Sequence, residues 1–355
     1  MPTSPALAEG LAEPLLRLYL EAEATLLRSI ARRLARGITE PGWAAAKLLE
    51  VHQLRTELEA RVGRLTTEGR AAIEEAVRTA YGKGLDAALA DLRQAEAAGA
   101  PTIASGFVTT PQFAVYRLAG EASRLVEATH FRVLRAATDA YREVVAEAAG
   151  QVTVGALTRR DAAQGALDRL LGRGITGFVD SAGRSWDMAS YVSMAVRTAT
   201  GHAAVAGHLD RLSDASHDLV RVPDVPRNCP TCARWEGRVL SITGRTPGYA
   251  TVAEARGAGL WHANCKHQAV GAFLPGVTTL PEPHDDAAGY AASQQQRYLE
   301  RQIRTWKTRE SLALSEQARR QSAAKVRAWQ ARIRQHVAAN DLRRLPYRES
   351  ITRAR

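Results

Sequence analysis

Apolar residues recur every three or four positions through residues 6–95, the spacing that places them on one face of an α-helix. Pro41 and Gly42 interrupt the pattern. A second stretch runs as far as Gly63, and a third follows it. The spacing therefore predicts long antiparallel helices joined by short breaks, with residues 1–96 forming a helical N-terminal region.

The helical character continues to residue 216. Alanine is abundant and aromatic residues make up only 6% of the chain, which favours helix over sheet. Residues 97–112 are rich in glycine, proline and small side chains, and they predict a linker. Helix is expected again over residues 113–216, where Thr158 and Asp161 have the spacing of a capping box.

The pattern of residues changes from helical to strand-like after residue 216. The segments HDLVRVP and GRVLSI are short, β-branched and alternating, so they predict strands. The segment TVAEARGAGL predicts one short helix, with Thr251 as its cap and Glu254 at the capping-box position. Residues 217–280 are therefore expected to form a small α+β domain. A linker and a basic helical tail follow it, at residues 281–293 and 294–355.

Composition excludes several classes of protein. No apolar stretch approaches the ~18 residues that a membrane-spanning helix needs. The first residues lack a basic segment followed by an apolar core, so we expect no secretory signal. Three cysteines cannot close a disulfide framework, which indicates a reducing compartment or a role in binding metal.

All three cysteines lie within forty residues of one another. Cys229 and Cys232 form a C-x-x-C pair, and His262 and Cys265 form an H-x-x-C pair further along the chain. Structural zinc usually takes four nitrogen or sulfur ligands arranged as a tetrahedron. The spacing predicts a zinc site made of these four residues, with His267 as an alternative ligand.

Other interpretations of the cysteines remain open. Three reduced cysteines and hydrogen-bonded histidines can also form the small core of a domain without metal. A thioredoxin-like redox role is disfavoured, because C-x-x-C in those proteins belongs to a βαβ unit that is not predicted here. Nucleophilic catalysis is disfavoured too, since histidines two and three residues from Cys265 are poorly placed as general bases. Glu236 and Asp224 are interpreted as structural.

The net charge of +11 is concentrated in the tail. Residues 294–355 hold 16 of the 48 basic residues and 5 of the 37 acidic ones, so the rest of the chain balances at 32 of each. A basic tail is typical of proteins that contact nucleic acid, although a solvated helix is an equally open interpretation. Val326, Trp329, Ile333 and Val337 have helical spacing and predict one docked face on this tail. The candidate DNA contacts are Arg319, Arg320, Lys325, Arg327, Arg332, Arg334, Arg343 and Arg344.

The region around the cysteines resembles the phage minor capsid (minor head, MuF-like) proteins. Members of that family have a Cys near a Trp-x-Gly sequence, a strand that ends before a Gly, and a G-L-F-H-x-N-C-R-H loop that leads to Pro-Gly. The residues of this chain that match the pattern are Cys232, Trp235, Gly237, Gly244, Gly259, Leu260, His262, Asn264, Cys265, His267, Pro275 and Gly276. An upstream segment is similar through Gly174, Ile175, Asp180, Gly183, Arg184, Tyr191, Met194, Arg197 and Thr198. The likeness covers roughly residues 110–280. This chain departs from the pattern at Trp261, Lys266 and Gln268.

The resemblance implies a structural protein of the virion. Its expected place is inside the head near the portal, with portal and capsid proteins as partners and the host cytoplasm as the compartment of assembly. The resemblance implies a role in head assembly and in DNA packaging or ejection. The charge of the tail adds packaged DNA as a candidate partner. It implies no catalytic activity, no small-molecule substrate and no membrane association.

Two rival classes remain. A zinc-supported nuclease of the HNH type would also use basic charge, cysteine and histidine, but it needs a catalytic histidine that follows a strand in a ββα fold. The histidines here are expected in a loop after a helix. A stand-alone DNA-binding zinc protein is the other alternative.

Overall fold

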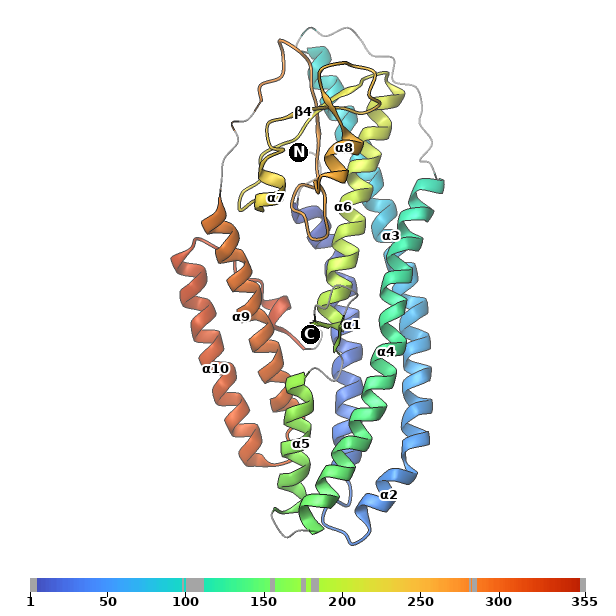
Figure 1. Ribbon diagram of the computed structural model, residues 1–355, viewed down its shortest axis with the longest axis vertical. Coiled ribbons are helices and arrows are strands. Elements are labelled where there is room, and N and C mark those ends of the chain that lie inside the picture. Colours follow the sequence, from blue (N-terminus) through green and yellow to red (C-terminus); the bar gives the residue numbers. More distant parts are fainter. Residues whose placement is uncertain are drawn as a thin grey trace. The chain divides into compact units, whose positions relative to one another are not determined.

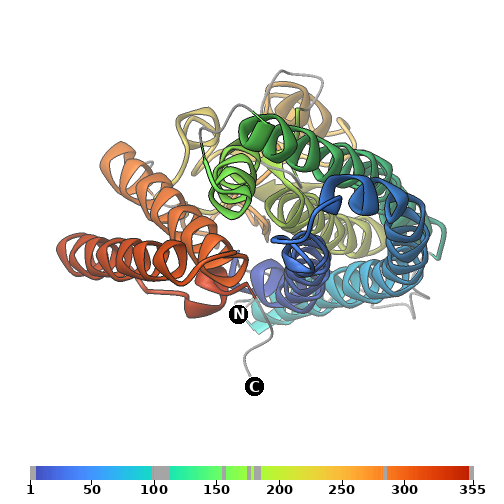
Figure 2. The same cartoon turned by 90° about the horizontal axis from the view of Figure 1, so that it is seen from below.

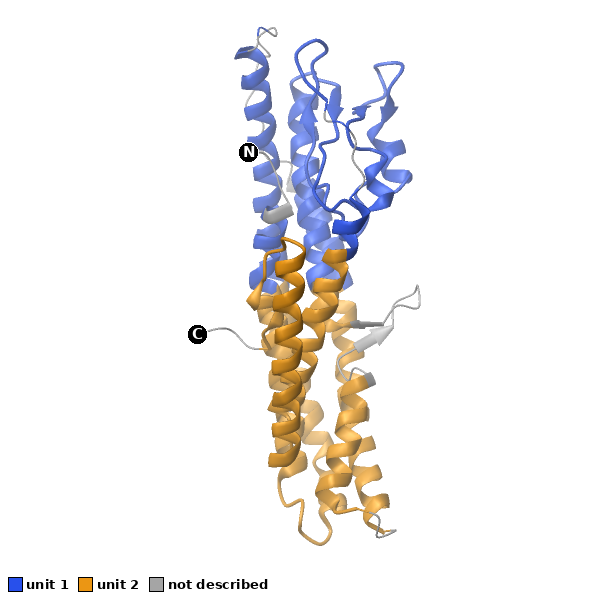
Figure 3. Ribbon diagram, turned by 90° about the vertical axis from the view of Figure 1, so that its left-hand side faces the viewer, with its two compact units in different colours: residues 1–15, 70–125, 193–291 blue, residues 16–69, 126–192, 292–355 orange. Residues whose placement is uncertain are grey.

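The structure, a computed structural model, describes residues 5–97, 99, 112–153, 157–173, 177–179, 185–280, 282 and 286–351. The chain divides into two compact units (Figure 3): unit 1 comprises residues 1–15, 70–125 and 193–291, and unit 2 comprises residues 16–69, 126–192 and 292–355. Among the described residues, five helices contribute to both units, and Figure 1 labels them: α1 (Pro5–Ala35), α3 (Val51–Ala97), α4 (Gln112–Thr153), α6 (Met188–Asp214) and α9 (Ala287–Ser311). The predicted mainly helical fold is confirmed.

Some predicted features fall outside the described residues. These are most of the linker at 97–112, part of the linker at 281–293, and the family-like residues Gly174, Ile175, Asp180, Gly183 and Arg184. Among the helices that the structure describes, none combines the length and the apolar character needed to cross a bilayer.

In unit 2 the long helices are joined by short elements. Helix α1 ends before a turn in which Gly42 has a positive φ of 76°, and α2 (Trp43–Leu49) begins at the next residue. The predicted break at Pro41 and Gly42 is therefore confirmed. The break predicted at Gly63 is wrong, because α3 runs through it without interruption. A glycine inside a helix costs only about 1 kcal/mol, and the buried Leu58 and Leu65 on either side hold α3 in place.

A buried polar contact fixes the packing of α1, α3 and α4 in unit 2. Tyr19 lies wholly buried, and its hydroxyl is 2.8 Å from Nε2 of His130. The other ring nitrogen of His130 lies 2.9 Å from Oγ1 of Thr66. Gly69 leaves the space that the Tyr19 hydroxyl occupies, since a Cβ there would come within 2.7 Å of it. The buried polar groups of Tyr19 and His130 are thus both satisfied by hydrogen bonds.

The next helix of unit 2 is α5 (Arg159–Arg173). Its first turn is capped as predicted, because the Asp161 amide donates to Oγ1 of Thr158 over 3.2 Å. Strands β1 (Gly177–Val179) and β2 (Ser185–Asp187) pair antiparallel. The tail supplies α9 (Ala287–Ser311), α10 (Glu316–Ala339) and a 3₁₀ helix, η1 (Pro346–Glu349). Helix α9 begins inside the segment that was predicted as a linker.

The tail folds as a helical hairpin (Figure 2). Apolar side chains line the contact between its two helices. Leu299 and Ile303 of α9 pack against Ile333 of α10, with Trp329 and Val337 partly buried beside them. Val326 is buried as well. The predicted docked face on α10 is therefore confirmed, and the partner that it docks on is α9.

The hairpin is also bonded to the rest of unit 2. The amide of Leu314 donates to Gln164 of α5 over 2.6 Å, and Nη2 of Arg309 donates to the Asp168 carbonyl over 3.1 Å. Arg304 donates to Oγ of Ser190 over 3.0 Å. The basic tail is therefore a packed part of a folded unit.

In unit 1 a small sheet covers parts of α3 and α6. Its strands are β3 (Leu219–Arg221), β4 (Val239–Ser241), β5 (Ala250–Thr251) and β6 (Gly271–Ala272), in the order β5-β4-β3-β6. The β3–β4 and β3–β6 pairs are antiparallel and the β4–β5 pair is parallel. Two short helices complete it, α7 (Pro230–Ala233) and α8 (Val252–Gly257). The two strands predicted from HDLVRVP and GRVLSI are confirmed as β3 and β4.

The core of this small domain is continuous with the two long helices. Buried residues from α3, α6, the sheet and the loops form one apolar cluster, which includes Ala88, Leu92, Val205, Leu209, Leu212, Val220, Leu240, Ala255 and Cys232. Capping holds α8 at its edge: Thr251 and Glu254 form the complete capping box that the sequence predicted. The small domain therefore does not fold around a separate core, but extends the packing of the helices.

Helices α3 and α6 approach each other closely in unit 1. A Cβ added to Gly84 would overlap the carbonyl oxygen of Ala204, and one added to Gly207 would overlap the carbonyl oxygen of Tyr81. The Tyr81 hydroxyl donates to Asp210 over 2.5 Å beside this contact. Glycine at both positions thus lets the two helix backbones touch. This contact fixes the position of α6 beneath the segments that carry the cysteines.

Candidate metal centre

The C-x-x-C pair is held in a single helical turn. Cys229 caps α7, and the amides of Cys232 and Ala233 both lie 3.0 Å from the Cys229 carbonyl. Pro230 occupies the first helical position, where no amide hydrogen is needed. Gly237 has a φ of 70°, and its amide donates a hydrogen bond to the carbonyl of Val222, the residue after β3. The turn therefore places both sulfur atoms on one side of α7.

The H-x-x-C pair lies in a loop with unusual backbone geometry. Gly259, Trp261 and Asn264 have φ values of 97°, 59° and 63°. Such values are uncommon for residues other than glycine, and they need support from their surroundings. At Gly259 a side chain would also meet Thr231, 2.9 Å from the position of its Cβ.

Helix α6 supplies that support. Nη2 of Arg197 donates to Oδ1 of Asn264 over 2.7 Å, and the Asn264 amide donates to Oγ1 of Thr198 over 3.1 Å. One turn further along, Nε2 of His202 lies 2.7 Å from the Trp261 carbonyl. Side chains from one face of α6 thus hold the two left-handed residues on either side of His262.

The two pairs meet at one point. Sγ of Cys229 is 3.0 Å from Nε2 of His262, and Sγ of Cys232 is 3.3 Å from Sγ of Cys265. Within the described residues, two overlapping sets have all their ligand atoms within 4.8 Å of one another: Cys229, Cys232 and His262, and Cys232, Cys265 and His267. The structure therefore brings together every cysteine and histidine that the sequence predicted as a ligand.

The donor set fits a tetrahedral ion. Around zinc, with Zn–S bonds of ~2.3 Å, two sulfur atoms lie roughly 3.8 Å apart, so Cys232 and Cys265 would separate by about 0.5 Å on binding. Three thiol groups and one imidazole are a ligand set that zinc takes in structural sites. The burial of Cys232 and Cys265 also agrees with the alternative of a small core without metal.

The electrostatics of the cluster favour a thiolate at Cys265. The Cys232 thiol donates a hydrogen bond to it, and this contact together with His267 outweighs burial and lowers the pKa of Cys265 to about 4. The hydrogen bond to Cys265 and burial raise the pKa of Cys232. The thiolate is the form that binds metal, and these contacts favour it at Cys265 over Cys232.

Glu236 organises the second layer of contacts. It is almost wholly buried, and its carboxylate accepts from the Val225 amide over 3.0 Å and from Nδ2 of Asn228 over 2.7 Å. Its Oε1 also lies 2.7 Å from Nε2 of His267. Burial alone would lower the pKa of His267, but Cys265 and Glu236 outweigh it and raise that pKa.

Both histidine rings have one nitrogen committed to an oxygen acceptor. Nδ1 of His262 lies 2.7 Å from the Ala263 carbonyl, which can only accept, so Nε2 is left to face Cys229 with its lone pair. In His267 the bond to Glu236 leaves Nδ1 3.7 Å from Sγ of Cys265. Contacts of this kind orient metal-binding histidines and fix their tautomer.

Some of these residues were not found from the sequence. Glu236 was interpreted as structural, and its bond to His267 spans 31 positions that carry no periodic signal. Arg197 and Thr198 were noted only through the family resemblance. His202 gave no signal, although it lies one helical turn beyond Thr198. Trp235, a further motif residue, is half-buried with the Arg238 guanidinium 5.8 Å from its ring centre.

The candidate DNA contacts lie on the tail hairpin and differ in their surroundings. Seven are exposed, and Arg344 is half-buried in a two-bond ion pair with Glu349. The exposed ones are Arg319, Arg320, Lys325, Arg327, Arg332, Arg334 and Arg343. Glu316 pairs with both Arg319 and Arg320, and Arg332 stacks over Trp329 with 4.5 Å to the ring centre.

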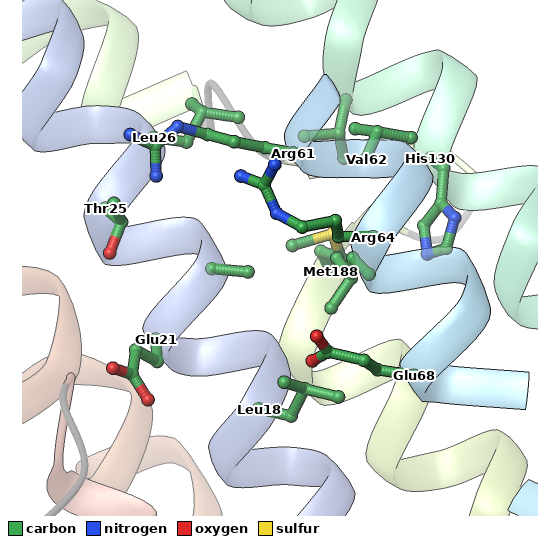
Figure 4. Close-up of a pocket in the computed structure, with 13 residues that line it drawn as sticks. Leu18, Glu21, Thr25, Leu26, Arg61, Val62, Arg64, Glu68, His130 and Met188 are labelled. Carbon is green, nitrogen blue, oxygen red and sulfur yellow. The ribbon is translucent and has the colours of Figure 1, made fainter. Parts of the chain in front are cut away.

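A separate hollow of about 360 Å³ lies in unit 2 between α1, α3, α4 and the start of α6 (Figure 4). Leu18, Leu26 and Val62 line it together with the charged Arg64 and Glu68. His130 also lines it, but both of its ring nitrogens are already bonded as described above. The histidine therefore serves the packing of the helices, and the cysteine cluster remains the better candidate for chemistry.

Comparison with known proteins finds a family match over nearly the whole chain. A family model described as phage minor capsid protein 2 matches residues 4–338. A structural protein of Lactococcus phage LL-H is 29% identical over 218 residues, which is 57% of this chain and 58% of that protein. The match thus spans less than two thirds of that relative's length. No solved structure matches the chain.

Proposed function

This chain belongs to the phage minor capsid protein 2 family, and we propose that it acts at the portal and on the inner side of the capsid during head assembly. The family match over nearly the whole chain carries the proposal. A role in DNA packaging or ejection follows from the same position. The chain is a structural protein in this proposal, with capsid components as its partners.

The helical body, residues 1 to about 215, is the proposed docking region. The fold leaves several of its large apolar side chains exposed, and such side chains are the ones that a bound partner would cover. In unit 1 these include Phe113, which is 80% exposed, and in unit 2 they include Phe131, which is 76% exposed. Co-purification with the portal protein of the same phage tests the assignment.

In that experiment Phe113→Glu and Phe131→Glu should each weaken co-purification with portal protein. Tyr249→Glu is the matched control, since Tyr249 is an exposed aromatic residue of the small domain. Equal loss in the control and the two body variants would contradict docking through the helical body. No co-purification by the unaltered chain would contradict the portal as the partner.

Zinc is the proposed occupant of the cysteine cluster, held by Cys229, Cys232, Cys265 and His262. It would link α7 to the loop that follows α8, and its binding energy would contribute to folding. Metal analysis of the purified chain should find about one zinc per molecule. Cys265→Ser should lose it, whereas His52→Asn, at an exposed histidine of α3, should retain it.

We propose no catalytic activity for the chain. The nuclease alternative needs a catalytic histidine after a strand, whereas His262 and His267 lie in the loop that follows α8. Incubating the protein with plasmid DNA and added divalent metal tests this point. Cleavage that Cys265→Ser abolishes would favour the nuclease.

The tail hairpin is the proposed DNA contact. Arg320, Arg327 and Arg334 are exposed and lie seven residues apart, which aligns them roughly 10.5 Å apart along α10. Because the hairpin is packed into unit 2, substitutions test the role better than truncation. The double variant Arg327→Gln, Arg334→Gln should make two fewer phosphate contacts. The slope of log affinity against log salt should therefore become less steep by about 1.8. An unchanged slope would assign the basic face to another partner.

A further inference from the structure

We propose that Cys232 and Cys265 form a disulfide when the cluster is free of metal and the surroundings are oxidising, with Cys229 left as a thiol. Their sulfur atoms lie 3.3 Å apart, and a disulfide requires about 2.05 Å. Both side chains belong to the buried cluster of unit 1, and the three cysteines are free thiols in the structure. The inference rests on the proposed zinc site only for the protection that metal gives.

The choice of this pair follows from the surroundings of each sulfur atom. Sγ of Cys229 faces the His262 ring at 3.0 Å, whereas Cys232 and Cys265 face each other. Once formed, a bond across 33 positions would also stabilise the fold against unfolding more than one across three, because it constrains the unfolded chain more.

The reaction is a thiol–disulfide exchange with a small-molecule disulfide such as oxidised glutathione. Cys229 is the half-buried thiol; it loses its proton to water, attacks one sulfur atom of the oxidant and releases one small thiol. Cys232, whose sulfur lies within 4.8 Å, attacks Sγ of Cys229 and expels the second small thiol, which takes up the Cys232 proton. Cys265 then attacks Sγ of Cys232, the bond between Cys229 and Cys232 breaks, and the leaving Cys229 takes up the proton that Cys265 gives up. Two protein thiols are oxidised and one small disulfide is reduced.

The metal and the disulfide would join the same two segments. Cys232 lies in α7 and Cys265 in the loop after α8, so either link closes the edge of the small domain. A virion component is made inside a cell, where thiols stay reduced, and then leaves it with the particle. The disulfide would keep the loop closed after the metal is lost. Oxidation therefore replaces one cross-link with another.

Peptide mapping of the full chain tests the proposal. Protein stripped of metal with a chelator is incubated with oxidised glutathione, its remaining thiols are alkylated, and it is digested with trypsin without reduction. The expected product links peptide 228–234 to peptide 257–266. Cys229 and Cys232 share the first peptide, so fragmentation must show the alkyl group on Cys229. A disulfide inside peptide 228–234, with Cys265 alkylated, would overturn the proposal.

Two variants and one metal control sharpen the result. Cys229→Ser should form the same cross-link more slowly, because the entry thiol is lost, and Cys232→Ser should form none. A cross-link in Cys232→Ser equal to that of the unaltered chain would overturn the pairing. Zinc-loaded protein should oxidise at least tenfold more slowly than stripped protein. Equal oxidation rates for the two preparations, with the predicted bond formed in both, would contradict the zinc site and still support the disulfide.

Discussion

Two glycines on one helix should respond to the same substitution with opposite signs. Gly82 and Gly84 lie two residues apart in α3, within unit 1. A Cβ at Gly82 would meet nothing within 4 Å. A Cβ at Gly84 would overlap the Ala204 carbonyl oxygen and come within 2.9 Å of the His208 amide nitrogen. We therefore expect Gly82→Ala to stabilise the protein and Gly84→Ala to destabilise it.

The magnitudes follow from two terms. Replacing glycine by alanine inside a helix contributes about 1 kcal/mol at either position. At Gly84 the added methyl group meets backbone atoms of α6, which cannot move aside as a side chain can, and overpacking of this kind costs roughly 1–3 kcal/mol or more. The helix term is common to both variants. The free energies of unfolding should therefore differ between them by about 1–3 kcal/mol.

Urea denaturation followed by far-UV circular dichroism measures this difference. The two variants should share one m-value and differ in the midpoint of the transition. Metal content offers a second readout, because displacement of α6 would also move Arg197 and Thr198 away from the loop that holds His262. If Gly84→Ala proved as stable as Gly82→Ala, the close approach of α3 and α6 would be refuted.

Three further substitutions test the layers around the site and the core of unit 2. Glu236→Ala should lower the free energy of unfolding by about 3–5 kcal/mol in chemical denaturation, because it leaves three buried donors without their acceptor; a loss below 1 kcal/mol would contradict its central role. Asn264→Ala should reduce zinc affinity in competition with a chromophoric chelator about tenfold, since Arg197 loses the side chain that it holds and alanine disfavours the φ of 63° at this position; unchanged affinity would show that the loop is self-supporting. Hydrogen bonds from Arg33, against the opposing effect of burial, and from Arg61 lower the pKa of Glu57 to about 2. A carboxyl whose pKa is lower in the folded state stabilises the fold at pH values above its unfolded pKa, near 4.5. The free energy of unfolding of the unaltered chain should therefore exceed that of Glu57→Gln by roughly 2 kcal/mol above pH 5, and this difference should disappear as the pH falls from about 5 to 2; a difference independent of pH would refute the ion-pair account.

Local chemistry made some elements of unit 1 predictable from the sequence. Thr251 and Glu254 cap α8 through contacts three residues apart, and such contacts can be read directly from spacing. Strands β3 and β4 followed from β-branched alternation. Strands β5 and β6 have two residues each, too few for any alternation to appear. Their pairing depends on neighbours that are distant in the sequence.

The ligands of the candidate site could be predicted, but the residues that position them could not. Cysteine and histidine carry metal chemistry in their side chains, so spacing alone singles them out. Glu236 and His202 are ordinary residue types whose roles depend on which loop lies above them. Their partners, His267 and the Trp261 carbonyl, lie 31 and 59 positions away. Only the packing of α6 against the small domain brings these groups together.

The tail shows why a charge count overstates an electrostatic surface. The sequence places an excess of +11 on residues 294–355, yet the fold directs part of it inward. Arg344 pairs with the buried Glu349, and Arg304 donates to the Arg348 carbonyl over 2.7 Å and to Ser190. Contacts of this kind fix the hairpin within unit 2 but withdraw those cations from an outside partner. The potential that packaged phosphate would meet is therefore set by the exposed side of α10 in particular. Arg327 there is exposed, and it forms no ion pair with any of the described residues.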